Sequence, residues 1–146
     1  TPERMEFHFI DVDMNNATLV MDWAGIRLSL KVEADPTKQV MINIENALAD
    51  AEEDDRWMVL RNAASFARDT KMTKEGLTWI TESVKLKNDN WYSYWVYAQL
   101  LAQNGENKDA VSKAEKSIEI GLADAKESGS PFNYEERIKA DIASWK

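Results

Sequence analysis

The chain has 146 residues, of which 44% are hydrophobic, and a formal net charge of −8. This length suits a domain with its own core, and the acidic balance repels phosphate backbones and anionic membranes, so we expect no nucleic-acid partner. The absence of cysteine excludes disulfides, thiolate nucleophiles and most structural zinc sites, and no apolar run approaches the length needed for membrane insertion.

Residues 1–34 predict a three-stranded antiparallel β meander. Two β-rich runs, residues 5–13 and 18–23, have the pattern of a hairpin. A third run alternates strictly and places four apolar side chains on one face: Ile26, Leu28, Leu30 and Val32. Because so small a sheet is stable only when its apolar face is covered, we interpret it as the remainder of a larger β domain, with the helices as further cover.

Residues 35–146 predict a helical domain of about six helices, so the fold class is α+β and mainly α. Asp35-Pro36 is a typical helix start, and the helix that follows has one apolar stripe, which predicts a buried face made of Val40, Ile44, Ala47, Leu48 and Ala51. A last helix has a second stripe, made of Ile138, Ile142 and Trp145. We expect this last helix to cover the end of the helical stack.

The middle helices contain an internal repeat. Glu75-Gly76-Leu77-Thr78 aligns with Asp109-Ala110-Val111-Ser112, and the offset between the two segments is 109 − 75 = 34. This period is typical of tetratricopeptide repeats, in which antiparallel helix pairs stack on one another. The segment from about Trp91 to Ile120 resembles that repeat well, with Gly105 at its turn, whereas the preceding unit has Lys71 where the turn glycine is expected.

A second resemblance covers nearly the whole chain. A β segment that ends in Asp22-Trp23, followed by helical hairpins and a terminal Trp145-Lys146, resembles the C-terminal part of a bacterial family named domain of unknown function 2911. That resemblance implies an exported, periplasmic protein with a longer β domain before the helices. It supplies no catalytic residue.

No recognisable catalytic motif occurs in the sequence, and we expect no enzyme activity, no metal and no cofactor. The only histidine, His8, lies in a predicted strand, where a structural, half-exposed position is the ordinary expectation. Asp11 and Asp13 echo the start of a calcium loop, but the required glycine and glutamate are missing further on. A turn rich in Asx residues is the better interpretation.

The candidate binding surface comes from repeat geometry. In tetratricopeptide stacks the first helix of each hairpin lines a groove, and the matching positions here are Met58, Arg61, Ser65, Arg68, Tyr92, Trp95 and Gln99. Two arginines that face aromatic rings could hold a carboxylate-bearing peptide, and an aromatic surface could also stack on sugar rings. Tyr92 and Trp95 could equally be ordinary side-chain packing.

Three functions therefore stay open. We favour a non-catalytic module that binds a protein or peptide in this groove. A second hypothesis is an exported glycan-binding or glycan-processing protein whose active site lies in the rest of the β domain; a pair of carboxylates across a cleft would favour it. A third is structural support of that β domain. The sequence does not indicate an oligomeric state.

Overall fold

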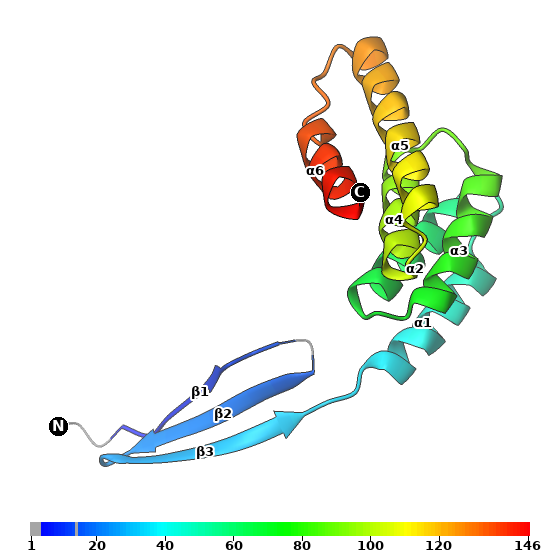
Figure 1. Cartoon of the computed structure of the whole chain (residues 1–146). Helices are drawn as coiled ribbons and strands as arrows, with labels where there is room; N and C mark the ends of the chain where they lie inside the picture. Colours follow the sequence, from blue (N-terminus) through cyan, green and yellow to red (C-terminus); the bar gives the residue numbers. More distant parts are fainter. Residues whose placement is uncertain (1–3, 14) are drawn as a thin grey trace. The chain divides into compact units, whose positions relative to one another are not determined.

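The computed structural model describes residues 4–13 and 15–146, which form a three-stranded antiparallel sheet followed by six helices (Figure 1). This confirms the predicted fold class, α+β and mainly α. The chain divides into two compact units between Asn43 and Ile44, inside the first helix, whereas the sequence predicts a boundary between residues 34 and 35. Among the described residues, no helix has both the length and the apolar content to cross a bilayer.

The meander consists of β1 (Glu6–Ile10), β2 (Asn16–Trp23) and β3 (Ile26–Glu33), with β2 in the middle. The turn between β2 and β3 has only two residues, and both have positive φ angles, 50° at Ala24 and 80° at Gly25. Such a turn has the twist that two neighbouring antiparallel strands need.

Asp13 organises the turn between β1 and β2. Its Oδ1 accepts hydrogen bonds from the backbone N–H groups of Asn15, at 2.7 Å, and Asn16, at 2.8 Å. These bonds hold the pKa of the Asp13 carboxyl below its usual range. The geometry is that of an Asx turn, because the carboxylate is used by the chain's own backbone.

The two faces of the meander differ sharply in chemistry. The strand register places only apolar side chains on one face, namely Phe7, Phe9, Ala17, Leu19, Met21, Trp23, Ile26, Leu28, Leu30 and Val32. Within the meander itself nothing covers this face, and its largest side chains are mostly exposed. The register confirms that the four apolar residues of β3 share a face, as their alternation predicts.

The opposite face is polar. The carboxylate of Asp22 accepts two hydrogen bonds from Arg27, at 2.7 and 2.8 Å, and lies 3.8 Å from Nε2 of His8. The Arg27 hydrogen bonds lower the pKa of Asp22. Val20, in register between His8 and Ser29, is fully buried on this face. His8 is thus a partly exposed strand residue beside one carboxylate, the structural position expected from the sequence.

The first helix, α1 (Thr37–Asp50), does not bury the apolar stripe that its sequence predicts. Four of the five residues of the stripe, namely Val40, Ile44, Leu48 and Ala51, are only half-buried, and Ala47 is exposed. The prediction of a buried face is wrong because no second element packs extensively along this helix. One contact fixes the end of α1, where the Leu48 carbonyl accepts a hydrogen bond from Arg56 at 3.0 Å.

Two helical hairpins follow, formed by α2 (Arg56–Asp69) with α3 (Thr73–Leu86) and by α4 (Trp91–Gln103) with α5 (Asn107–Ser128). A buried serine fixes each hairpin in the same way. Ser83 Oγ donates to the Trp57 carbonyl at 2.8 Å, and Ser117 Oγ donates to the Trp91 carbonyl at 2.7 Å. We call this hydrogen bond the serine–tryptophan lock. The two serines are 34 residues apart, as are the two tryptophans, so the contact recurs at the offset of the sequence repeat.

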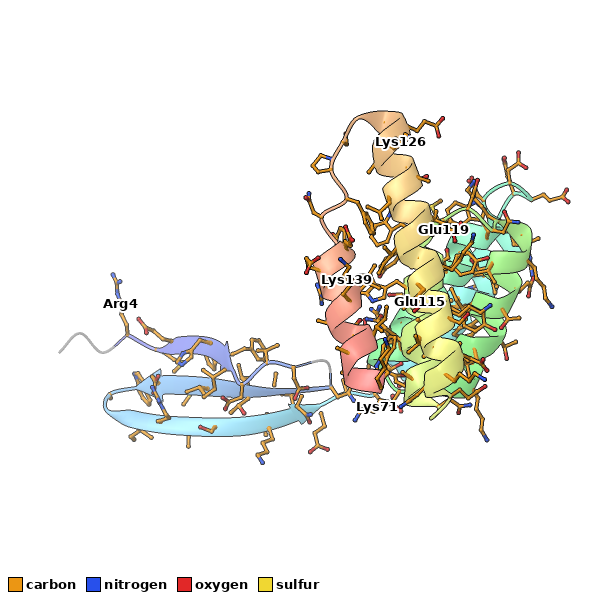
Figure 2. The ribbon with its side chains drawn as sticks, turned by 45° about the horizontal axis from the view of Figure 1, so that its top comes forward. Arg4, Lys71, Glu115, Glu119, Lys126 and Lys139 are labelled. Atoms are coloured by element: carbon orange, nitrogen blue, oxygen red, sulfur yellow. The ribbon has the colours of Figure 1, made fainter. Side chains whose placement is uncertain are left out.

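The turns of the two hairpins share a left-handed residue. The φ angle is 60° at Lys71, between α2 and α3 (Figure 2), and 83° at Gly105, between α4 and α5. Lysine therefore adopts the conformation that glycine adopts in the second hairpin, although its Cβ makes this region unfavourable.

We expect Lys71→Gly to raise the free energy of unfolding by about 0.5–1 kcal/mol, because relief of the left-handed strain exceeds the entropy that glycine adds to the unfolded chain. Urea denaturation followed by circular dichroism measures the change. The matched control is Gly105→Lys in the second hairpin, which should destabilise by about 1 kcal/mol. Shifts of the same sign in both variants would contradict the shared turn geometry.

The hairpins and the last helix, α6 (Glu135–Trp145), enclose two apolar clusters. One cluster joins α2, α3 and α4 through Ala64, Ile80, Val96 and Leu100. The other joins α4, α5 and α6 through Trp95, Ala98, Ala114, Ile138 and Ile142, with Trp145 packed against it. The stripe predicted for the last helix is thus the face that α6 buries against the second hairpin.

Candidate functional site

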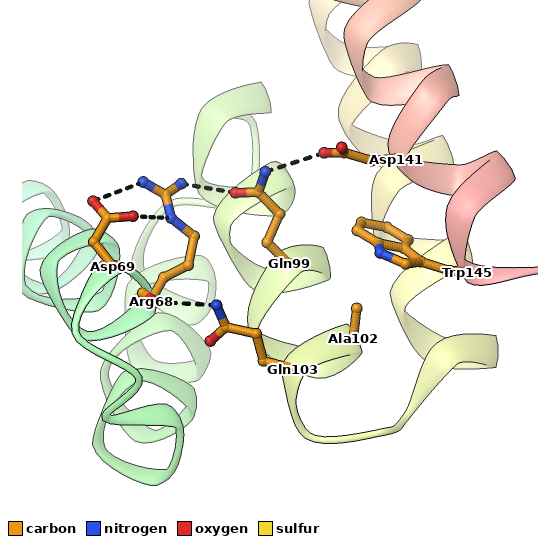
Figure 3. A pocket seen from close by; sticks show the side chains of 7 residues that line it. All are labelled: Arg68, Asp69, Gln99, Ala102, Gln103, Asp141 and Trp145. Atoms are coloured by element: carbon orange, nitrogen blue, oxygen red, sulfur yellow. Dashed lines mark hydrogen bonds and ion pairs between the residues drawn. The ribbon is translucent and has the colours of Figure 1, made fainter.

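Three helices, α2, α4 and α6, line a groove on the helical unit. It consists of two adjoining cavities of about 450 and 400 Å³ that share Arg68, Asp69 and Gln99. The other residues of the first cavity are Tyr92, Trp95, Tyr134 and Arg137. The second cavity is completed by Ala102, Gln103, Asp141 and Trp145, and Figure 3 shows α2 and α6 on either side of α4.

A chain of hydrogen bonds crosses the groove from α2 to α6. Arg68 donates to Oε1 of Gln99 at 2.7 Å, and Nε2 of Gln99 donates to Oδ2 of Asp141 at 3.0 Å (Figure 3). The indole Nε1 of Trp95 donates to the same Asp141 oxygen at 2.8 Å. Because each of these groups has a partner on the neighbouring helix, the network fixes the spacing of the three helices.

The α2 wall adds a second branch to this network. Arg68 also donates to Ser65 Oγ at 3.1 Å, and that hydroxyl lies 3.1 Å from the hydroxyl of Tyr92. Arg68 is paired with its neighbour Asp69, at 2.8 and 3.2 Å. Burial acts to lower the pKa of Arg68, but the hydrogen bonds and charge of Asp69 outweigh it, so that the pKa is raised.

Three aromatic residues, Tyr92, Trp95 and Tyr134, line the first cavity near the start of α4, and they contact further rings that do not line it. Trp91 contacts Phe132 edge-on with ring centroids 5.1 Å apart, and it lies against Tyr134 with centroids 4.8 Å apart. Trp95 and Tyr92 meet edge-on at 6.2 Å. Trp95 is only 4% exposed and belongs to the core, whereas Tyr134 is 43% exposed.

Two arginines lie on these rings from opposite walls. The guanidinium of Arg61, on α2, is 5.5 Å from the ring centre of Tyr92 and 5.2 Å from that of Trp57. Arg137, on α6, lies 5.2 Å above the ring centre of Trp95. None of the ion pairs among the described residues involves either arginine. Burial lowers the pKa of Arg61, yet an arginine stays protonated at neutral pH, so both charges are present and not neutralised.

The structure brings together most of the residues predicted for the groove. Arg61, Ser65, Arg68, Tyr92 and Gln99 are joined by the contacts described above. Trp95 touches the groove with its polar edge only, because α6 covers its ring. Met58, Arg61 and Ser65 line neither cavity, although Arg61 and Ser65 both contact Tyr92, which lines the first. Met58 is on α2 and 37% exposed.

The sequence prediction missed the whole α6 wall, including Arg137, Asp141 and Trp145, and also Asp69 on α2. A signal for this wall was present. The stripe of Ile138 and Ile142 indicates that α6 packs on the second hairpin, which places the neighbouring polar residues beside α4. The repeat offset alone does not find these residues, because α6 begins outside the repeat spacing.

The second cavity contains a pair of carboxylates, Asp69 and Asp141. A glycoside hydrolase needs one such carboxyl to hold a proton for the leaving oxygen. Here Asp69 accepts two hydrogen bonds from the guanidinium of Arg68, and Asp141 accepts one from Trp95 and one from Gln99. Both carboxylates are therefore already bonded to side chains of the groove.

Among residues 4–13 and 15–146 no three His, Asp or Glu side chains lie close enough together to hold a metal ion. The chain was also compared with known proteins. No family model, no curated protein and no solved structure matches it. The contacts of the groove are therefore the basis for a functional proposal.

Proposed function

We propose that the helical unit is a non-catalytic, tetratricopeptide-like module that binds an extended protein segment through its carboxylates in the groove between α2, α4 and α6. The observation that carries this proposal is the pair Arg61 and Arg137. Each guanidinium is stacked on an aromatic ring and has no carboxylate partner among the described residues, in a chain with 26 acidic and 18 basic residues.

The excess of acidic residues in the chain makes Arg61 and Arg137 notable, because neither has a carboxylate partner among the described residues. In a chain with an excess of acidic side chains, neighbouring carboxylates neutralise other arginines, as Glu82 does for Arg56 and Asp69 for Arg68. Arg61 donates two hydrogen bonds to the neutral amide oxygen of Asn62, at 3.3 and 2.9 Å, which leaves its charge without a counterion. A ligand carboxylate would supply that counter-charge, and a guanidinium binds it with two parallel hydrogen bonds. The ring of Tyr92, which lines the first cavity, would add apolar contact area beside those bonds.

The groove is also held in shape before any ligand arrives. The hydrogen bonds from Arg68 through Gln99 to Asp141 link all three walls. A surface that is already ordered loses less conformational entropy on binding than a flexible one. Repeat scaffolds use their first helices in this way, since the core lies between the hairpins and leaves that face free.

We expect Arg61→Gln and Arg137→Gln each to weaken binding of an acidic peptide by about five- to tenfold, since each removes a charge-assisted contact. An array of blocked acidic octapeptides identifies a binder, and isothermal titration calorimetry measures its Kd for each variant. Arg56→Gln is the matched control, because it removes the same charge from the same helix at a residue whose charge is already paired with Glu82.

The proposal fails if no acidic peptide binds, or if the double variant of Arg61 and Arg137 binds as tightly as the original chain. Thermal unfolding of the variants checks that the fold is retained. A failure of this kind would favour the hypothesis that the helices serve as structural support of a β domain.

A further inference from the structure

The two cavities of the groove carry opposite charge. Arg68 and Asp69 line both cavities and neutralise each other. The remaining charged residue of the first cavity is Arg137, and that of the second is Asp141. The groove is therefore positive at its aromatic end and negative at the end formed by the last turns of α2, α4 and α6.

Asp141 has an oxygen available for a ligand. Both hydrogen bonds that it accepts from side chains, from Trp95 and Gln99, go to Oδ2. No described residue donates a hydrogen bond to Oδ1 or forms an ion pair with this carboxylate. A carboxylate has lone pairs for about four hydrogen bonds, so Asp141 can accept more donors.

An aromatic ring lies beside this carboxylate. Trp145 is one helical turn after Asp141 on α6, and its indole extends across the cavity toward Ala102 of α4 (Figure 3). An indole face next to a carboxylate favours an ammonium or guanidinium group, through cation–π and ionic attraction together. The cavity of about 400 Å³ lies within the usual range of ligand pockets.

The distance between the two ends suits a short stretch of extended chain. Arg137 and Asp141 are four residues apart on one helix, which corresponds to roughly 6 Å along its axis. An extended peptide advances about 3.3 Å per residue, and side chains two positions apart point to the same face. An acidic and a basic side chain two positions apart, with one residue between them, would therefore reach both charged groups.

We propose that the cavity lined by Asp141 and Trp145 is a subsite for a basic side chain, so that the groove selects segments in which an acidic and a basic residue are separated by one other. This rests on the proposed function, which supplies the acidic half of the ligand at Arg61 and Arg137. The carboxylate of Asp141 would pair with the ligand cation while Trp95 and Gln99 hold it in place.

The test uses the full chain and blocked tripeptides. Glu-Ala-Lys and Lys-Ala-Glu are compared with the same two peptides in which norleucine replaces lysine, so that length and apolar area are kept and only the cation is lost. Titration followed by NMR chemical shifts gives Kd for weak ligands. In the better-bound order, lysine should improve Kd about three- to fivefold over norleucine.

Asp141→Asn is the decisive variant, because the asparagine oxygen can still accept hydrogen bonds from Trp95 and Gln99 while the charge is removed. The advantage of lysine should disappear, and the norleucine peptide should bind as before. Asp124→Asn, an exposed position on α5, is the control with the same change in charge. If Asp141→Asn does not fold, Trp145→Leu takes its place and should reduce the advantage of lysine.

The outcomes separate the two proposals. Equal binding of the lysine and norleucine peptides, or an advantage of lysine that persists in Asp141→Asn, would overturn the subsite alone. In that case the norleucine peptide still loses affinity in Arg137→Gln, and the carboxylate-binding groove stands. If no peptide of the set binds, in either order, both proposals fail.

Discussion

Replacement of Trp95 by alanine should lower the free energy of unfolding of the helical unit by about 3–5 kcal/mol, the usual range for a large buried aromatic residue. Trp95 is 4% exposed and packs with Ala98, Ile138 and Ile142. Its removal leaves a cavity between α4 and α6 and takes away the indole hydrogen bond to Asp141. Both losses loosen the attachment of the last helix.

Urea denaturation followed by far-ultraviolet circular dichroism measures this change. Trp23→Ala is the matched control, since Trp23 is 45% exposed, on the meander, and its loss should change the helical transition by less than about 0.5 kcal/mol. If the two variants are equally stable, Trp95 is not the link between α4 and α6. A Trp95 variant is also unsuitable for binding experiments on the groove, because a loss of stability would be measured together with any loss of binding.

Leu100→Ala should destabilise the helical unit by about 2–5 kcal/mol, for a different reason. Leu100 is fully buried and packs in the cluster that joins α2, α3 and α4. It also fills the space above Gly76 on α3, where an added Cβ would lie 2.7 Å from Cδ2 of Leu100 and 3.0 Å from Cβ of Ala67. The glycine is thus a place where a helix approaches its neighbour closely.

This contact allows a double-mutant cycle. Gly76→Ala in the original chain should destabilise by about 1–3 kcal/mol through overpacking, despite alanine's better helix propensity. In the Leu100→Ala background the methyl group enters the cavity, so the same change should be nearly neutral or stabilising. Additive effects in the two backgrounds would show that Gly76 and Leu100 do not compete for the same space.

Much of the fold could be predicted from the sequence, because periodicity indicates which side chains share a face of a strand or helix. The alternation of β3 indicated its apolar face, and the spacing of Ile138, Ile142 and Trp145 indicated the face that α6 buries. The offset between the two repeat units located both hairpins, and the structure adds its physical basis, the lock of Ser83 on Trp57 and of Ser117 on Trp91.

Periodicity did not predict the exposure of the apolar stripe on α1. The stripe of α1 has the same spacing as that of α6, yet no element packs extensively along α1, and Ala47 is exposed. A pattern shows which face a helix can bury, not whether another element covers it. The turn at Lys71 shows a related limit, since a lysine there adopts a glycine conformation in which the Met72 N–H donates to the Ala67 carbonyl at 2.8 Å.

The candidate groove could be predicted only in part. Positions on α2 and α4 follow from the repeat, so Arg61, Arg68 and Gln99 were found. Asp141 and Arg137 were missed, because α5 continues to Ser128 and the last helix therefore begins outside the repeat spacing. Trp95 belongs to the core because α6 packs against its ring. The pattern of α4 alone does not show that α6 covers this side chain.

The recurring serine–tryptophan lock makes the length of the groove adjustable in discrete steps. A copy of Trp57–Asn90 inserted between Asn90 and Trp91 would keep the offset from one unit to the next, and with it both ends of every lock. Each inserted unit would add one first helix to the groove without disturbing α6 at its end. The architecture is therefore modular, and duplication or deletion of one hairpin would change the length of ligand that the groove accommodates while keeping its two terminal walls.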